Sequence, residues 1–166
     1  MAQQLADRRD IDFVIWEQMQ AESILGKSVY KEFNKKTCDM IITEARNLAI
    51  KEMLPTLAEG DKQGIRFDKG NVKVPDCYHD VHHLILEGEW QSLSVSPEMG
   101  GQGVPGFVSV ACAEYFLGAN WALFTYASMG NGTAKMIDLY GTPEQKEKYI
   151  PNIISGKWGG TMLLTE

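Results

Sequence analysis

The chain has 166 residues, of which 44% are hydrophobic and 23% charged, and its formal net charge is −6. That length fits one domain with a sizeable core, and the composition is typical of a globular protein. The acidic balance argues against a nucleic-acid partner, and no stretch has the pattern of a signal peptide or a membrane span. Three widely spaced cysteines, an odd number, indicate reduced thiols and a cytoplasmic location.

The first half of the sequence predicts helices. The first helix covers about residues 8–24, with Asp7 or Asp10 as its cap. A longer helix begins near Thr37 and is kinked at Pro55. Its expected apolar face consists of Ile42, Ala45, Ala49, Met53, Leu57 and Ala58.

A polar stretch punctuated by glycines, residues 59–72, is typical of a loop. A third helix is expected to start at Pro75, which suits a first helical turn. The side chains expected to face inward from this helix are Tyr78, Val81 and Ile85. Residues 93–106 hold four glycines and two prolines, which favour a compact turn.

The second half predicts three more helices. A fourth begins near Val108, and a fifth covers residues 121–140. Because the first half of the fifth helix has no charged residue, we expect it to be buried on most sides. Thr142 and Gln145 predict a capping box at the start of the next helix, and residues 161–165 then predict a short strand.

Two of these stretches carry a resemblance to a known family. Residues 97–103, Pro-Glu-Met-Gly-Gly-Gln-Gly, resemble a glycine-rich turn of the acyl-CoA dehydrogenases. Residues 139–166, with Tyr-Gly-Thr-Pro-Glu-Gln-Lys at their start and Leu-Thr-Glu at their end, resemble the segment of that family that approaches the flavin. The first 25 residues are similar to the N-terminal extension of the larger, methylthiopropanoyl-CoA dehydrogenase-like members.

This resemblance implies an all-α fold, an N-terminal helical domain of about six helices that ends in the first strand of a missing β-domain. We expect an N-terminal extension helix over residues 1–30 and the acyl-CoA dehydrogenase helical domain over residues 31–158. Residues 159–166 are then the truncated start of the middle β-domain.

The resemblance also implies site residues. Met162, Leu163, Leu164 and Thr165 are expected to lie along flavin adenine dinucleotide (FAD), with the Thr165 hydroxyl near its reactive nitrogen. The residues expected to line the acyl slot are Tyr126, Ser128, Met129 and Gly130. From the residues alone, two other interpretations stay open: a plain buried strand at 162–165, and close helix packing at Gly130 and Gly132.

Metal and base chemistry have little support in the sequence. His79 and His83 are four residues apart, beside His82, but no cysteine or carboxylate completes a metal site, so a solvated helix flank is expected. Desaturation needs a carboxylate that removes the Cα proton. In the family this glutamate belongs to a C-terminal domain that this chain lacks, so we expect no catalytic residue here.

The sequence is therefore interpreted as the N-terminal part of a FAD-dependent acyl-CoA dehydrogenase, an oxidoreductase of fatty acid metabolism that is inactive as this fragment. The resemblance implies an acyl-CoA substrate, an electron-transferring flavoprotein or similar acceptor, and a homo-oligomer when intact. Two alternatives remain open: an acyl-CoA oxidase or flavin monooxygenase on the same scaffold, and a non-enzymatic helical binding module.

Overall fold

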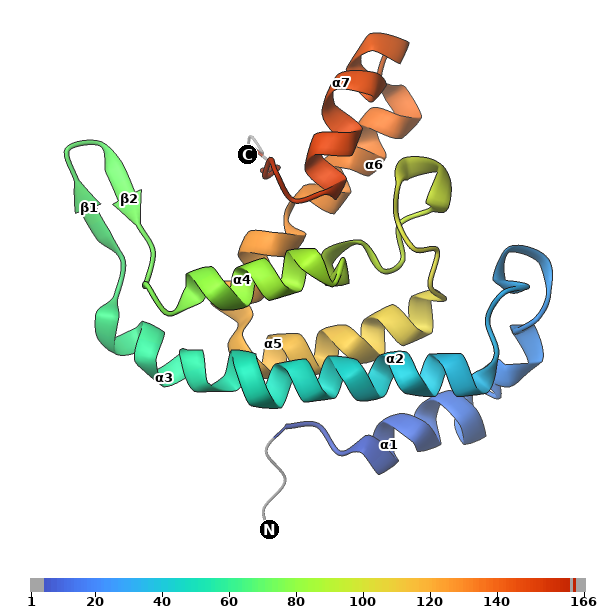
Figure 1. Cartoon of the computed structure of the whole chain (residues 1–166). Coiled ribbons are helices and arrows are strands. Elements are labelled where there is room, and N and C mark those ends of the chain that lie inside the picture. The colour runs from blue at the N-terminus through green and yellow to red at the C-terminus, as the bar shows by residue number, and fades with distance from the viewer. Residues whose placement is uncertain (1–4, 162, 164–166) are drawn as a thin grey trace. The chain divides into compact units, whose positions relative to one another are not determined.

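The computed structural model describes residues 5–161 and 163. The chain forms two compact units, Met1–Val81 with Val104–Trp121 and His82–Gly103 with Ala122–Glu166, here called the first and second units. Most described residues are helical, which confirms the all-α fold class (Figure 1). The predicted boundaries of the extension, the helical domain and the β-domain stay predictions.

The first unit begins with a helical segment whose type of helix changes along the chain. α1 spans Arg8–Asp12 and is capped by Asp7, whose carboxylate accepts a hydrogen bond from the Arg9 N–H. A π-helical turn, Phe13–Gln18, and two 3₁₀ turns, Ala21–Ile24 and Ser28–Tyr30, follow. The predicted helix over residues 8–24 is thus present, although it is interrupted at Gln20.

Arg8 fastens this segment to the next helix, α2 (Lys35–Leu48). Its guanidinium donates to Asp12 at 2.8 Å within α1, and to the Asp39 carboxylate at 3.0 Å and Thr43 Oγ1 at 2.7 Å on α2. Trp16 adds a hydrogen bond from its indole nitrogen to the same Asp39 carboxylate at 3.0 Å. The position of α1 therefore rests on a directional polar network as well as on apolar burial.

The long helix is divided in two at the expected proline. A π-helical turn, Ala49–Met53, joins α2 to α3 (Leu54–Gln63), and Pro55 stands in the first turn of α3. The expected continuation of the apolar face through Leu57 and Ala58 is wrong, because both are exposed and Thr56 and Gly60 are buried instead. Thr56 and Gly60 are seven and eleven residues beyond Ala49, which is where helical geometry returns to the same face.

The predicted loop over residues 59–72 is also wrong. α3 continues to Gln63, and β1 (Arg66–Asp68) then pairs antiparallel with β2 (Asn71–Lys73), with Phe67 opposite Val72. Both turn residues, Lys69 and Gly70, have positive φ angles of 47° and 85°. Such a two-residue turn matches the twist of a hairpin, which is why the polar stretch forms strands and not a loop.

The remaining helices are α4 (Tyr78–Glu87), α5 (Gly106–Ser128), α6 (Gly130–Tyr140) and α7 (Pro143–Ile154). Short 3₁₀ turns, Trp90–Ser92 and Pro97–Met99, stand between α4 and α5. Tyr78, Val81 and Ile85 are buried as expected, although α4 begins three residues after Pro75. The boundary between the two units falls within α4 and within α5.

The predicted fifth helix over residues 121–140 needs correction. Its first part joins the fourth helix as α5 through Asn120, whose backbone is non-helical (φ −162°, ψ 91°), and the helix is interrupted at Met129. Its first half is not buried on most sides, because Trp121 and Tyr126 are 70% and 46% exposed. A low-propensity glycine pair follows the interruption, which favours a break there.

The second unit has a small core between α6 and α7, which lie side by side (Figure 1). Its buried members are Ala134, Ile150, Ile153 and Ile154. The predicted capping box is confirmed: Thr142 Oγ1 accepts from the Gln145 N–H, and Gln145 Oε1 accepts from the Thr142 N–H at 2.9 Å. α7 thus starts where its sequence specifies and presents its isoleucines to α6.

Contrary to expectation, one segment is long and apolar enough to span a membrane by length and composition. It covers Gly106–Tyr140, with a mean hydropathy of 1.3 in its most apolar window. Half of that window is buried inside the protein, and the helix is broken at Asn120 and Met129. This is the pattern of a core helix, so we do not interpret it as a membrane span.

Candidate functional site

The four residues predicted to bind substrate lie together at the junction of α5 and α6. Tyr126 and Met129 are 46% and 49% exposed, and Gly130 is buried. Ser128, which is half-buried, donates a hydrogen bond from its hydroxyl to the Phe124 carbonyl at 3.0 Å. The Ser128 hydroxyl proton is therefore already used in a hydrogen bond within the helix. The feature of Ser128 that matters to a ligand is then its small size.

Gly130 is held against α7. A Cβ atom at Gly130 would lie 2.4 Å from Cγ2 of Ile153, a core residue. At Gly132, by contrast, a Cβ atom would meet no atom within 4 Å. Of the two interpretations of these glycines, helix packing or an acyl slot, helix packing accounts for Gly130. It does not account for Gly132, where a side chain would have free space.

The chain beyond α7 returns to the start of α6. Gly160 is buried, and a Cβ atom there would lie 2.5 Å from Thr133 Oγ1 and 3.2 Å from the Gly130 Cα. Only a backbone without a side chain can approach this closely. Gly130, one of the predicted substrate residues, is therefore adjacent to Gly160, which stands two residues before the first predicted cofactor residue.

Most of the predicted cofactor residues lie outside the described residues. This applies to Met162, Leu164 and Thr165. Thr161 and Leu163 have no regular secondary structure, and Leu163 is 95% exposed. The strand and its approach to FAD stay predictions.

Histidine and cysteine side chains do not form a reactive centre in the described part of the chain. No group of three or more His, Cys, Asp or Glu residues there could hold a metal ion, and His83 pairs with Glu87 at 3.0 Å on the exposed flank of α4. The three cysteines are free. Burial raises the pKa of Cys38 to about 11 and that of Cys112 to about 12, so both are protonated and unreactive at neutral pH.

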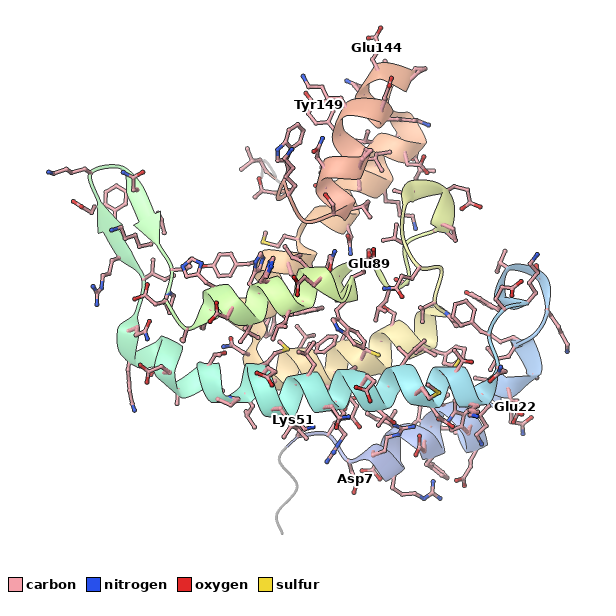
Figure 2. The ribbon with its side chains drawn as sticks, in the orientation of Figure 1. Asp7, Glu22, Lys51, Glu89, Glu144 and Tyr149 are labelled. Carbon is pink, nitrogen blue, oxygen red and sulfur yellow. The ribbon has the colours of Figure 1, made fainter. Side chains whose placement is uncertain are left out.

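A cleft of about 570 Å³ in the second unit is a feature that sequence reasoning missed. The end of α4, the two 3₁₀ turns, α6 and α7 all contribute to it. Figure 2 labels one contributor, Glu89, which stands just after the C-terminal end of α4. The residues that line the cleft include Leu86, Glu89, Gln91, Glu98, Asp138, Lys146, Ile150 and Pro151. They come from positions up to 65 residues apart, and although Glu98 and Lys146 lie within the two stretches that carry the family resemblance, no local motif shows that these residues meet.

Known proteins of one family match most of the chain. The family profile "Acyl-CoA dehydrogenase, N-terminal domain" matches residues 35–157. The chain is 30% identical over 158 residues to a 3-methylmercaptopropionyl-CoA dehydrogenase of Ruegeria pomeroyi, covering 95% of the chain and 27% of that relative. It is 31% identical over 160 residues to a broad-specificity linear acyl-CoA dehydrogenase of Mycobacterium tuberculosis, covering 95% and 26%.

The chain therefore belongs to the acyl-CoA dehydrogenase family, through its N-terminal domain. The resemblance to the larger, methylthiopropanoyl-CoA dehydrogenase-like members is confirmed by the Ruegeria relative. The chain spans about a quarter of the length of these relatives.

Proposed function

We propose that this chain forms the N-terminal helical domain of a FAD-dependent acyl-CoA dehydrogenase that desaturates an acyl-CoA thioester between Cα and Cβ. The observation that supports this most directly is the contact between Gly160 and Gly130. It brings Gly130, at the α5–α6 junction proposed to line the acyl slot, next to the chain that leads into residues 162–165, which are proposed to run along the flavin.

FAD would accept the hydride that leaves Cβ. The contribution of this chain is to bind the acyl group and to exclude water from it. Exposed Tyr126 and Met129 offer apolar surface to an acyl chain, and Ser128 sets the width of the slot by its small size. The base that removes the Cα proton would come from outside these residues, so the isolated chain is proposed to be inactive.

Further parts of the proposal rest on the family alone. They are an electron-transferring flavoprotein or similar acceptor, a homo-oligomeric enzyme and a cytoplasmic location. Among alternatives, an oxidase or monooxygenase on the same scaffold would use the same surfaces with a different acceptor. A non-enzymatic module would keep the fold without binding flavin.

The test compares the complete gene product with the isolated chain. The complete product should purify with FAD, and an acyl-CoA should bleach the flavin in the absence of oxygen. The isolated chain should not reduce a dye acceptor with any acyl-CoA. A complete product without flavin, or a gene that encodes these 166 residues alone, would favour the non-enzymatic module.

Ser128→Leu in the complete product tests the acyl slot. If Ser128 lines the slot, the leucine side chain should fill part of it. The activation free energy derived from kcat/KM should then rise by about 1–3 kcal/mol more for long acyl groups than for short ones. Ser155→Leu, on the exposed end of α7, is the control. Lower stability with an unchanged chain-length preference would remove Ser128 from the proposed slot.

A further inference from the structure

Two hydrogen bonds tie one short turn of the second unit to both of the helices beside the proposed acyl slot. The turn is Trp90–Ser92, and both bonds involve Gln91. Asn131, in the first turn of α6, donates from its side-chain amide to the Gln91 carbonyl. Because Gly130 of the proposed slot directly precedes Asn131, this bond holds the slot beside the turn.

The second bond holds the end of α7. The side-chain nitrogen Nε2 of Gln91 donates to the Ile154 carbonyl at 3.2 Å. Ile154 is the last residue of α7, and the last carbonyls of a helix have no partner within it. The chain then continues to Gly160, where a Cβ atom would lie 3.2 Å from the Gly130 Cα. Gln91 therefore holds the two segments that bring Gly130 and Gly160 together.

The Gln91 side chain is costly where it lies. The residue is 5% exposed, and its amide oxygen Oε1 is buried without a hydrogen-bond partner in the part of the chain that the structure describes. A methionine of similar length would fill the space without burying that oxygen, so stability alone does not favour a glutamine. What the amide adds is direction, because a hydrogen bond constrains both a distance and an angle.

Direction matters because Gly130 and Gly160 belong to two parts of the proposed reaction site. Gly130 stands at the junction proposed to hold the acyl group, and Gly160 leads into the residues proposed to run along FAD. Hydride transfer depends on how these two reactants are placed, and a misplacement of about 1 Å can slow such a step about a hundredfold. Apolar packing between α6 and α7 buries surface but is not directional.

We propose that Gln91 and Asn131 are positioning residues, which set the placement of the acyl slot relative to the flavin by holding Gly130 and Gly160 together. This inference rests on the proposed function and deepens it. Neither amide touches the acyl group or FAD; both act through the backbone of α6 and of the chain after α7. Loss of either bond should slow flavin reduction and leave acyl-CoA binding nearly unchanged, because the apolar surface for the acyl chain remains.

The first test uses the complete gene product. Gln91→Met removes the amide and keeps the length of the side chain, and Asn131→Leu removes the donor from a side chain of similar shape. Each should slow the limiting rate of flavin reduction by an acyl-CoA about tenfold to a hundredfold in anaerobic stopped-flow experiments, with the Kd of the acyl-CoA changed less than about threefold. The double variant should be little slower than either single variant, because both bonds belong to one network.

Thr142→Ala is the control for a purely structural effect. It removes the cap at the opposite end of α7, so it should lower the stability and leave the rate of flavin reduction unchanged. Thermal unfolding of each variant, recorded beside its rate, separates a loss of stability from a loss of alignment.

The second test needs no flavin. In the isolated chain, the α-protons of Gly130 and Gly160 should give a nuclear Overhauser effect in the NMR spectrum, since the two backbones approach closely. Gln91→Met and Asn131→Leu should weaken this effect, and Thr142→Ala should preserve it.

Two results would overturn the inference. One is an unchanged nuclear Overhauser effect in both amide variants. The other is a complete product that contains FAD and is reduced at the same rate with and without the two amides, or is slowed equally by Thr142→Ala. A complete product without FAD is a distinct result: it would refute the proposed function, and with it the role of the two amides in flavin reduction.

Discussion

The side-chain nitrogen of Asn120 on α5 donates a hydrogen bond to Thr56 Oγ1 on α3, at 2.9 Å. Thr56 in turn donates to the Met53 carbonyl at 2.6 Å, at the end of the π-helical turn. Both polar residues are almost fully buried, at 1% and 6% exposure. This chain of hydrogen bonds joins the irregular residue of α5 to the irregular turn before α3, within the first unit.

Thr56→Val should lower the free energy of unfolding by about 1–3 kcal/mol, because the isosteric valine leaves the buried Asn120 amide without this acceptor. Urea unfolding measures the change, and Thr161→Val at an exposed position is the matched control. In a protein that already carries Thr56→Val, Asn120→Ala should lower the free energy of unfolding by less than it does in the unmodified protein. Fully additive losses would show that the two side chains act independently.

Alanine substitution at the two glycines near the start of α6 should change the free energy of unfolding in opposite directions. Gly130→Ala should destabilise by about 1–3 kcal/mol, since its Cβ would overlap Ile153. Gly132→Ala has free space and should stabilise by up to about 1 kcal/mol through helix propensity. Thermal unfolding of the pair is the measurement, and a stabilising Gly130→Ala would contradict the packing described here.

Thr142→Ala should cost about 0.5–2 kcal/mol, because it removes the side-chain acceptor of the capping box on α7. Thr142→Ser keeps the oxygen and serves as the control. Hydrogen exchange of the first turn of α7 should speed up in the alanine variant alone. Equal exchange in both variants would mean that packing against α6, and not the cap, holds this end.

Alkylation should distinguish the cysteines in the native state. Cys77 is partly exposed, and although burial and the nearby Glu59 raise its pKa, reagents can reach it. Cys38 and Cys112 are buried thiols with strongly raised pKa values and should react only on unfolding. Mass spectrometry after brief treatment with iodoacetamide should locate the label on Cys77. Prompt labelling of Cys112 would show that its surroundings open.

The same two buried thiols predict a loss of stability in base. Their folded pKa values, about 11 for Cys38 and about 12 for Cys112, lie above the ordinary value of 9.0. Their contribution is therefore complete below pH 9.0 and is lost as pH rises toward those values. Cys38→Ala/Cys112→Ala should flatten this part of the stability profile. An unchanged slope would assign base unfolding to other groups.

Local signals predicted the parts of the fold that depend on neighbouring residues. The capping box at Thr142 and the inward face of α4 follow from spacing alone. The hairpin was predictable in principle, since Ile65, Phe67 and Val72 alternate with charged residues around a Lys69–Gly70 turn, but its glycines suggested a loop.

Long-range pairing explains what the sequence could not show. The burial of Thr56 depends on Asn120, which is 64 residues away. The cleft around Gln91 needs segments that meet only in the folded second unit. The residues proposed to line the acyl slot, by contrast, came from the family resemblance, and the approach of Gly160 to one of them, Gly130, became visible only in the folded chain.

The β1–β2 hairpin has a practical consequence for engineering the chain. Both strands are fully exposed, and the turn residues Lys69 and Gly70 already adopt backbone angles typical of a tight loop tip. Exposed loop tips of this kind accept inserted sequence better than any other part of a domain. An epitope or a fluorophore-binding peptide placed between Lys69 and Gly70 would report on the protein without disturbing a buried side chain.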